Sequence, residues 1–274
     1  MTDPAKTDRY AVIGNPVAHS KSPAIHAAFA RQTGQDLEYI RLEAPLEGFA
    51  ETLADFFASG GRGCNVTVPF KEQAYRLATR LNERARQAGA VNTLWCDEHG
   101  WVGDNTDGVG LVRDLTRHVD LAGKAIVLLG AGGAARGAIG PLLAEQPARL
   151  TIANRSVEKA AQLADHFAAL GTLRASSFAE LTAPADIVIN ATSASLAGST
   201  LPLPDGLWRA DTLAYDMMYG RTATPFLAQA EAAGAGLCID GLGMLVEQAA
   251  EAFYLWRGVR PETADVLADL RAGL

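Results

Sequence analysis

The sequence predicts a protein of two α/β domains, the second of which is a Rossmann-type parallel sheet. Two observations support this fold class. Short apolar runs alternate with helical stretches along the chain, and one of these runs enters a glycine-rich turn that opens a small-residue helix. With 274 residues, the chain is long enough to form two modest domains, each with its own core.

The first half of the chain is expected to alternate strands and helices. A helix should begin at Ser22, with Ser22 as its cap and Pro23 in the first helical position. Further helices are expected over 46–59 and 71–87. Strands are expected at 10–13, 37–42 and 64–68, and a hairpin should join 90–95 to 101–102.

The second half is a more regular βα series, which predicts a parallel sheet. Its strands are expected at 125–129, 150–153, 186–190, 212–217 and 237–240. The polar turn around Asp107 marks a boundary, so that residues 1–106 form the first domain and 107–241 the second. The helical, Ala-rich stretch 242–274 could close the second domain or return to the first.

The composition is that of a globular protein, with 49% hydrophobic residues, 20% charged residues and a net charge of −7. This negative balance argues against nucleic acid or an anionic membrane as a main partner. No apolar run is long enough to cross a membrane, and the stretch Met1 to Arg9 lacks an apolar signal core. We therefore expect a cytoplasmic protein.

The cysteines Cys64, Cys96 and Cys238 are odd in number and far apart. Neither they nor the five histidines have the spacing of metal ligands, so we expect no metal site. Buried free thiols in a reducing compartment are the preferred interpretation of the cysteines.

The glycine-rich turn predicts a phosphate-binding site. Gly130 permits a tight turn, Gly132 allows close approach of the backbone to phosphates, and Ala135 allows close helix–strand packing. The helix N-terminus adds free N–H groups and a partial positive charge. A glycine turn by itself can also be an ordinary βα connection.

The end of the next strand indicates which dinucleotide is bound. An NAD site places Asp or Glu about 20 residues after the glycines, whereas this chain has Asn154, Arg155, Ser156 and then Lys159. A guanidinium can bind a 2′-phosphate that a carboxylate would repel. NADP is therefore the predicted cofactor; the alternative is that Arg155 is a solvated surface charge.

Polar residues also follow the strands of the first half. Ser20 and Ser22 at a helix start suit a carboxylate ligand, although Ser22 could simply cap its helix. Asn65 and Thr67 share one strand face, and Lys71 opens a helix where its charge opposes the dipole. Asn92 in an apolar strand needs partners, which a ligand or a structural network could supply.

Lys71 and Asp107 could form an acid/base pair across a cleft between the domains. A lysine in a partly dry site can lose its proton near neutral pH, and a carboxylate would orient it. The pair could then move the proton that accompanies hydride transfer between an alcohol and a ketone. A turn or cap role is the alternative for Asp107.

These segments together resemble the shikimate dehydrogenase family. The matching motifs occur in the family's order over residues 14–248, and the N-terminal and Asn-Thr-Asp-Gly motifs are the specific ones. They are Gly14-Asn15-Pro16, Ser20-Lys21-Ser22-Pro23, Asn65-Val66-Thr67, Pro69-Phe70-Lys71, Gly89-Ala90-Val91-Asn92-Thr93, Asn105-Thr106-Asp107-Gly108, Gly130-Ala131-Gly132-Gly133-Ala134, Asn154-Arg155, Asn190-Ala191-Thr192-Ser193, Tyr215-Asp216-Met217 and Asp240-Gly241-Leu242-Gly243-Met244-Leu245.

The resemblance implies reversible, NADP-dependent reduction of 3-dehydroshikimate to shikimate, a step of aromatic amino-acid and chorismate biosynthesis. It implies that Ser20 and Ser22 hold the substrate carboxylate, that Lys71 is the acid/base, and that the last helices return to the first domain. The residues implied around the rest of the substrate are Thr67, Lys71, Asn92, Asp107, Tyr219 and Gln248. Those implied at the cofactor are Gly130, Ala131, Gly132, Gly133, Ala134, Asn154, Arg155, Ser156, Lys159, Thr192, Met217, Gly241 and Glu83.

Two positions depart from the family pattern, with Ser156 where Thr is common and Lys159 where Arg is common. A lysine binds phosphate as a point charge without the arginine fork. A quinate/shikimate dehydrogenase with relaxed cofactor use and a non-catalytic NADP-binding sensing module are the rival interpretations. The protein could be a monomer or a homodimer.

Overall fold

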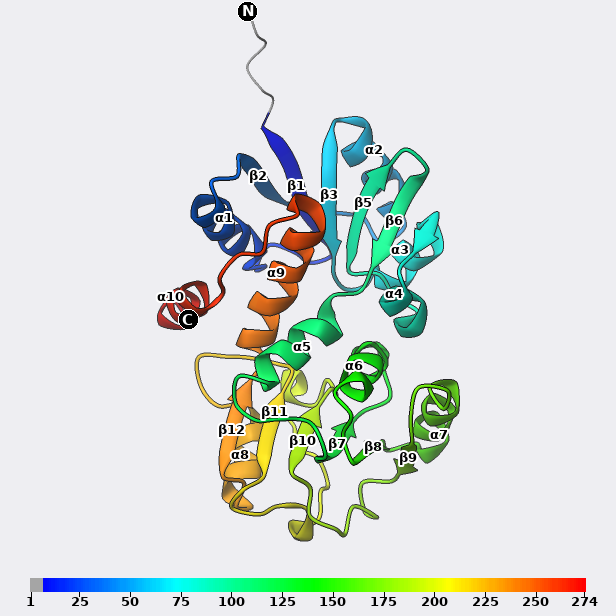
Figure 1. Ribbon diagram of the computed structural model, residues 1–274, viewed down its shortest axis with the longest axis vertical. Helices are drawn as coiled ribbons and strands as arrows, with labels where there is room; N and C mark the ends of the chain where they lie inside the picture. The colour runs from blue at the N-terminus through cyan, green and yellow to red at the C-terminus, as the bar shows by residue number, and fades with distance from the viewer. Residues whose placement is uncertain (1–6) are drawn as a thin grey trace, which may run out of the picture. The chain divides into compact units, whose positions relative to one another are not determined.

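Each half of the chain builds its own sheet in the computed structural model, which describes residues 7–274 (Figure 1). One compact unit contains the residues up to Thr106 together with Val246–Ala268. The other contains Asp107–Leu245 and Asp269–Leu274. The stretch 242–274, expected as one C-terminal segment, is thus shared between the two units. The chain enters the first unit within one helix, after Leu245, and returns to the second unit within the next helix, after Ala268. Residues 1–6 of the stretch used to assess a signal segment lie outside the described residues.

The first unit holds a mixed sheet whose strand order is β2-β1-β3-β5-β6-β4. Strand β1 is parallel to its neighbours β2 and β3, whereas β5 is antiparallel to both β3 and β6. The strands are β1 (Asp8–Gly14), β2 (Leu37–Glu43), β3 (Gly61–Val66), β4 (Arg80–Leu81), β5 (Thr93–Asp97) and β6 (Gly100–Asp104).

Alternation along β1 supplies the two cores of this unit. Ala11 and Ile13 face one core, and Tyr10 and Val12 face the other. The first core is closed by α2 (Phe49–Ala58), α3 (Lys71–Leu77) and α4 (Glu83–Ala88). The second lies under α1 (Ser22–Thr33) and α9 (Leu242–Arg257), which meet through aromatic rings. A last helix, α10 (Ala264–Ala272), ends the chain.

The second unit holds a fully parallel sheet with the strand order β12-β11-β10-β7-β8-β9. Its central strands are buried on both faces, as the near-continuous apolar runs predicted. The strands are β7 (Ala125–Leu129), β8 (Arg149–Ala153), β9 (Leu173–Ser176), β10 (Ile187–Asn190), β11 (Leu213–Asp216) and β12 (Leu237–Asp240). The helices are α5 (Asp107–Leu115), α6 (Gly133–Ala144), α7 (Val157–His166) and α8 (Pro225–Ala232), with short 3-10 turns η1 (Ser195–Ala197) and η2 (Asp205–Leu207).

The single helix predicted over 71–87 is wrong. Helix α3 ends at Leu77, and the chain then pairs with β6 before α4 begins. Thr79 N donates to Trp101 O at 2.8 Å and Asn82 N donates to Gly103 O at 2.9 Å. Backbone pairing with a sheet edge therefore overrides the helical pattern of the sequence here.

Smaller differences concern element ends and one missed strand. Helix α2 begins three residues later than predicted because Gly48 and Pro45 close a turn, and β3 occupies 61–66 rather than 64–68. Strand β9 was not predicted, because it is a short edge strand. Asn92 lies just before β5 rather than within it. Of the cysteines, Cys64 is buried, but Cys96 is exposed and Cys238 half-buried, so burial was wrongly expected for Cys96.

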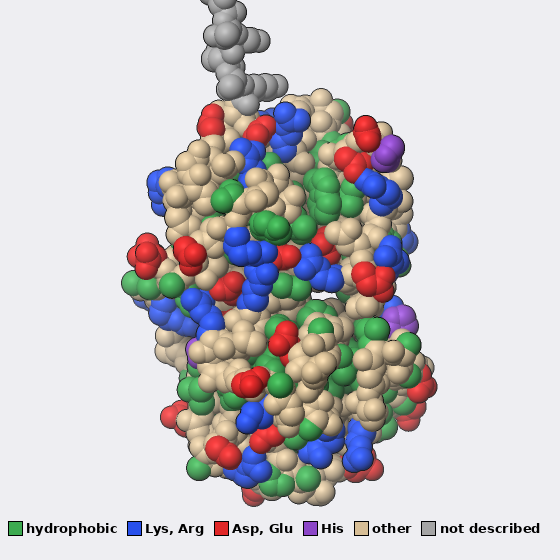
Figure 2. Space-filling view, in the orientation of Figure 1, with side chains coloured by type: hydrophobic (Ala, Val, Ile, Leu, Met, Phe, Trp, Pro, Cys, Tyr) green, Lys and Arg blue, Asp and Glu red, His purple; other side chains and the backbone are tan. Residues whose placement is uncertain are grey.

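The surface carries mixed charge. On the face shown in Figure 2, Lys and Arg side chains are interspersed with Asp and Glu. No helix among residues 7–274 has the length and apolar character needed to cross a membrane.

Candidate functional site

The first candidate site lies at the carboxyl ends of β1 and β3. The chain leaves β1 to form β2 on one side of it, and later returns to form β3 on its other side. In α/β sheets this reversal of strand order opens a crevice at the strand ends where ligands bind. Residues 15–21, between β1 and α1, therefore border the natural place for a ligand in the first unit.

Ser20 and Ser22 come together in this turn. Ser20 Oγ donates to Ser22 Oγ at 3.2 Å and accepts from Ser22 N at 3.3 Å. Ser22 is the first residue of α1, and the capping position belongs to Lys21, so the prediction that Ser22 is the cap is wrong. The Ser20 hydroxyl instead accepts the first helical N–H.

The start of α1 is suited to an anion. The first turn of the helix contains no acidic residue, and Arg41 donates to Ser20 O from Nε at 3.0 Å and from Nη2 at 2.6 Å. This contact fixes the carbonyl of the turn and leaves the two hydroxyls at the helix N-terminus. The helix dipole and two adjacent hydroxyls together favour a carboxylate.

Thr67 and Lys71 follow β3 at the same edge of the sheet. Thr67 N donates to Ile13 O at 2.9 Å, and Lys71 is the first residue of α3; both side chains are half-buried. Lys71 O accepts from Val91 N at 2.9 Å, which ties the start of α3 to the segment before β5. The lysine is therefore held by its backbone beside Asn92.

Asn92 is the centre of a buried network of neutral groups. Its Oδ1 accepts from Thr106 N and from Thr93 Oγ1, each at 2.8 Å, and its Nδ2 donates to Thr106 Oγ1 at 3.0 Å. The same Nδ2 lies 3.5 Å from Oε1 of Gln248, on α9. Of the two alternatives for a buried Asn, a structural network is present, and it holds two predicted site residues together.

Asn65 has a supporting position. It is buried, its Oδ1 accepts from Tyr39 Oη at 2.7 Å, and its Nδ2 donates to Thr93 Oγ1 at 3.1 Å. Asn65 was expected to share a strand face with Thr67, but its side chain is buried in hydrogen bonds with Tyr39 and Thr93 and supports the site from within the fold. Tyr39 was not a predicted residue, and only the alternation of its strand could have placed it there.

Asp107 opens α5, directly after the strand end that Asp104 fixes. The carboxylate of Asp104 is fully buried and accepts from Asn82 at 2.8 Å, from Arg84 at 2.6 and 3.1 Å, and from Asn105 N at 2.7 Å. Sequence reasoning treated Asp104 only as part of a polar turn. Its ion pair could not be predicted, because Arg84 lies on a helix that was not recognised as separate.

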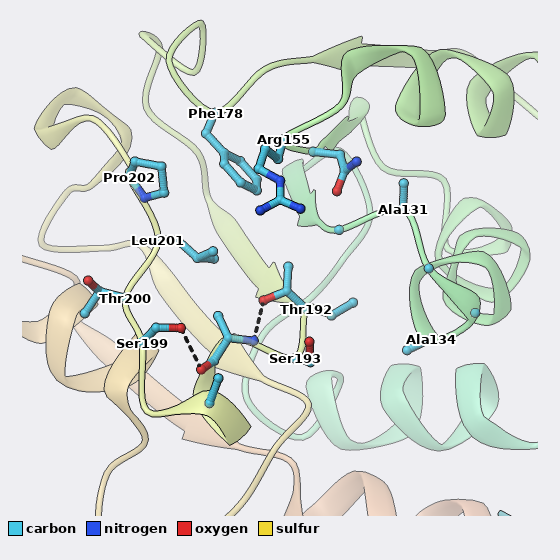
Figure 3. Close-up of a pocket in the computed structure, with 17 residues that line it drawn as sticks. Ala131, Ala134, Arg155, Phe178, Thr192, Ser193, Ser199, Thr200, Leu201 and Pro202 are labelled. Atoms are coloured by element: carbon cyan, nitrogen blue, oxygen red, sulfur yellow. Dashed lines mark hydrogen bonds between the residues drawn. The ribbon is translucent and has the colours of Figure 1, made fainter. Parts of the chain in front are cut away.

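The second candidate site is a pocket of about 640 Å³ in the second unit. It lies where β7 is flanked by β8 and β10, so the strand order reverses here as well. The lining includes eight residues predicted at the cofactor (Figure 3). They are Gly130, Ala131, Gly132, Gly133, Ala134, Asn154, Arg155 and Thr192.

The glycine turn forms an open cradle. Gly130 has φ +109°, and a Cβ there would meet Thr192 Cγ2 at 3.1 Å and Ala191 O at 3.2 Å. Around Gly132 and Gly133 a Cβ would meet no atom within 4 Å, and both residues are exposed. The first turn of α6 carries no acidic residue, so exposed backbone N–H groups and the helix dipole face this space.

Arg155 extends the pocket beyond β8. In Figure 3 its guanidinium points into the pocket near Phe178, which also lines it. Asn154 Nδ2 donates to Ser156 O at 2.9 Å and shapes the turn into α7. Ser156 and Lys159 sit in this first turn but do not line the pocket.

An acidic residue also enters this turn. Ser156 Oγ donates to Glu158 Oε2 at 2.8 Å. The backbone amide of Glu158 at the start of the helix lowers the pKa of this carboxyl, and the Ser156 hydroxyl adds to the effect. The hydroxyl predicted at a 2′-phosphate is thus bonded to a carboxylate.

Met217 and Gly241 lie together after β11 and β12. A Cβ on Gly241 would come within 2.2 Å of Met217 O, so this close approach requires glycine. Tyr219 follows, half-buried, and burial raises the pKa of its hydroxyl, with the Asp240 charge acting in the same direction. Neither Met217, Gly241 nor Tyr219 lines the pocket around the glycine turn.

Glu83 belongs to the first unit, whereas the pocket lining comes from the second. It is exposed on α4 and accepts from Arg86 at 2.8 Å and from Gln87 at 3.1 Å; the Arg86 contact lowers the pKa of the carboxyl. Both of these contacts are within its own helix, and they give no physical reason for a cofactor role.

One wall of the pocket was missed by the sequence reasoning. It consists of Ser193, Ala194 and Ala197 together with 199–202. Thr192 Oγ1 accepts from Ala194 N at 3.2 Å, and Ser199 Oγ donates to Ala194 O at 3.1 Å (Figure 3). This long connection has no periodic pattern, and only its position after a strand end could have drawn attention to it.

Comparisons with known proteins show the family of the chain. Three family models match: the shikimate dehydrogenase substrate binding domain over residues 12–94, shikimate / quinate 5-dehydrogenase over 112–198, and the shikimate 5'-dehydrogenase C-terminal domain over 241–271. The chain is 63% identical over 271 residues to shikimate dehydrogenase (NADP(+)) of Dechloromonas aromatica, with 98% of this chain and 99% of the relative covered.

Solved structures of similar fold include members of the same family. An Ael1 enzyme from Pseudomonas putida is 46% identical with a TM-score of 0.93, covering 96% of this chain and 98% of the other. Shikimate 5-dehydrogenase from Thermus thermophilus, in complex with NADP(H) and shikimate, is 34% identical with a TM-score of 0.85, covering 97% and 100%. The chain belongs to the shikimate dehydrogenase family.

Proposed function

We propose that this protein catalyses the reversible, NADP-dependent reduction of 3-dehydroshikimate to shikimate, a step of aromatic amino-acid and chorismate biosynthesis. One observation carries the proposal: the open glycine cradle is followed by Arg155 and not by a carboxylate at the end of β8. The strong similarity to a relative named shikimate dehydrogenase (NADP(+)) supports it.

The residues of the second unit fit NADP. The space around Gly132 and Gly133 can accept a pyrophosphate, which the N–H groups of α6 would bind. Arg155 would bind the 2′-phosphate through its guanidinium fork, aided by Ser156 and Lys159. When bound as NADPH, the cofactor supplies a hydride to the carbonyl carbon of the substrate.

The residues of the first unit fit a small hydroxylated acid. Ser20 and Ser22 would hold the carboxylate at the N-terminus of α1. Thr67, Asn92 and Gln248 offer hydroxyl and amide groups for the ring hydroxyls, and the buried network joins Asn92 to Gln248. We assign Tyr219 to the substrate and Met217 and Gly241 to the nicotinamide.

Lys71 and Asp107 are the proposed acid/base pair. Lys71 Nζ would give a proton to the carbonyl oxygen during reduction and take it back during oxidation. Its place at the start of α3, where the helix dipole disfavours a cation, is unfavourable for stability and consistent with a functional role. Asp107 would orient the ammonium group.

Quinate is the second candidate substrate, because one matching family model is described by both shikimate and quinate. A site that is not built against one extra hydroxyl rejects it only weakly. The proposed cytoplasmic location and a monomeric or homodimeric state are expectations from the sequence.

The experiment is a set of initial rates at 340 nm for shikimate or quinate with NADP⁺ or NAD⁺, and the reverse reaction with 3-dehydroshikimate and NADPH. Rapid turnover with shikimate and NADP⁺ is expected. Comparable rates with quinate or NAD⁺ would favour the broader enzyme, and no turnover with any pair would favour a sensing module.

A further inference from the structure

Asp216 is a fully buried carboxylate at the carboxyl end of β11. Its Oδ1 accepts from Asn190 Nδ2 at 3.1 Å and from Met218 N at 3.0 Å. Its Oδ2 accepts from Ser195 Oγ and from Thr224 Oγ1, both at 2.6 Å. Four donors therefore compensate the buried group, and such a saturated arrangement must be specified by the surrounding chain.

The four donors come from separate segments at the carboxyl ends of the strands. Asn190 ends β10, Ser195 begins η1, Met218 follows β11 and Thr224 caps α8, where its Oγ1 also accepts from Leu227 N at 3.3 Å. One side chain thus ties together the loops that leave two neighbouring strands. The pocket lies at the same carboxyl ends of the strands.

Asn190 carries the effect of Asp216 to the pocket. Because its Nδ2 donates to the carboxylate, its Oδ1 must face the other way, where it accepts from Thr192 N at 3.0 Å and from Thr192 Oγ1 at 2.7 Å. Thr192 lines the pocket, holds Ala194 N, and presents its Cγ2 to Gly130 (Figure 3). The Asp216 carboxylate thereby fixes the orientation of the Asn190 amide.

We propose that Asp216 is a positioning residue for the cofactor, which acts by fixing Asn190 and, through it, Thr192 and the pocket wall that follows. This inference rests on the proposed function, because it assumes that the pocket holds NADP. Asp216 does not line the pocket and has no proposed contact with the cofactor.

A carboxylate is required because it only accepts hydrogen bonds. An asparagine at this position would present one oxygen and one NH₂ group. If the NH₂ group faced Asn190 and Met218, it would meet two donors. If it faced Ser195 and Thr224, both hydroxyls would have to accept instead of donate, although Thr224 Oγ1 already accepts from Leu227 N. The size of the side chain would stay the same, while the charge-assisted hydrogen bond that orients the Asn190 amide would be weakened.

Asp186 offers a matched control at the opposite end of β10. Its Oδ2 accepts from Ala125 N at 2.7 Å, its Oδ1 accepts from Arg209 at 2.7 Å, and it does not line the pocket. Asp186→Asn therefore removes the same charge from the same sheet without touching the proposed relay.

The test is calorimetric titration of NADP⁺ into wild type, Asp216→Asn and Asp186→Asn at one temperature well below each melting transition, with the KM for shikimate measured in parallel. We expect Asp216→Asn to weaken NADP⁺ at least tenfold while the KM for shikimate changes less than threefold, and Asp186→Asn to leave NADP⁺ affinity within twofold. Wild-type affinity in Asp216→Asn, or equal losses in both variants, would overturn the inference.

Two further arms complete the design. Failure of the wild type to bind NADP⁺ would refute the proposed function itself, whereas a normal wild type with an unaffected Asp216→Asn refutes only the positioning role. If Asp216→Asn does not fold, the same titration is made with Ser195→Ala, which removes one donor to Asp216 at a half-buried position. A loss of NADP⁺ affinity of about threefold is expected there, and an unchanged affinity would overturn the proposal.

Discussion

The turn from β1 into α1 and the turn from β7 into α6 occupy equivalent places in their sheets. Each follows a strand that has its successor in the chain on one side and a later strand on the other. Each leads into a helix whose first turn lacks an acidic residue. The turn before α1 offers two hydroxyls, however, whereas the turn before α6 offers bare glycine backbone.

This difference matches two kinds of anion. Side-chain hydroxyls can define the position of a small carboxylate, but they occupy the space that a bulky diphosphate needs. Glycines leave that space open and bring several N–H groups within reach. The two helices also differ in packing: the buried face of α6 has only aliphatic residues, whereas that of α1 includes His26 and Phe29 among aromatic rings.

Proton transfer is proposed at the strand ends of the first unit, and Lys71→Ala is expected to have the largest effect on activity. We expect kcat to fall about 10³-fold, since general acid–base catalysis contributes on this scale. The Kd of NADP⁺ should stay within twofold. Lys124→Ala, on the chain just before β7, is the control and should retain full turnover. A Lys71→Ala variant with most of its activity would end the acid/base assignment.

The packing of α1 predicts a pH effect on the first unit that α6 cannot produce. His26 is fully buried, stacks on Tyr39 at 4.2 Å, and, among residues 7–274, no side chain or backbone group forms a hydrogen bond with its ring nitrogens. Burial lowers the pKa of His26 to about 3. Its ordinary pKa is about 6.5.

Between these pKa values the unfolded chain binds a proton that the folded chain does not. The free energy of unfolding therefore falls as the pH falls below about 6.5, by about 1.4 kcal/mol per pH unit, or about 3 kcal/mol by pH 4. His26→Phe should remove this part of the acid sensitivity in urea unfolding at pH 7, 5 and 4. The exposed His99→Gln should not. The same pH dependence in wild type and His26→Phe would disprove the role of His26.

The smallest effect concerns the second unit's selectivity. Because Glu158 holds the Ser156 hydroxyl, it competes with a 2′-phosphate for that group. Glu158→Gln should tighten NADP⁺ about two- to fivefold and leave NAD⁺ unchanged, with the gain fading at high salt because the site is exposed. Titrations at two ionic strengths would measure this. Glu231→Gln, on α8, serves as control, and a weaker affinity for NADP⁺ in Glu158→Gln would contradict the competition.

The sequence predicted the glycine turn and most strands of the second sheet well, because their apolar runs are continuous and their turn chemistry is local. It failed at 71–87, where pairing of Arg80–Leu81 with β6 decides the structure. It also missed the pocket wall after Thr192 and the buried role of Asp216. These features depend on partners far along the chain, which one-dimensional periodicity does not encode.

The most direct test of this division between the two turns measures both ligands on two variants: Ser20→Ala/Ser22→Ala and Arg155→Ala. The serine variant should raise the KM for shikimate at least 30-fold, since hydrogen bonds to a charged group contribute about 1.5–3 kcal/mol each, and should keep the wild-type Kd of NADP⁺. Arg155→Ala should weaken NADP⁺ about 100-fold, with the KM for shikimate and the affinity for NAD⁺ unchanged. A variant that weakens shikimate and NADP⁺ equally would contradict the account.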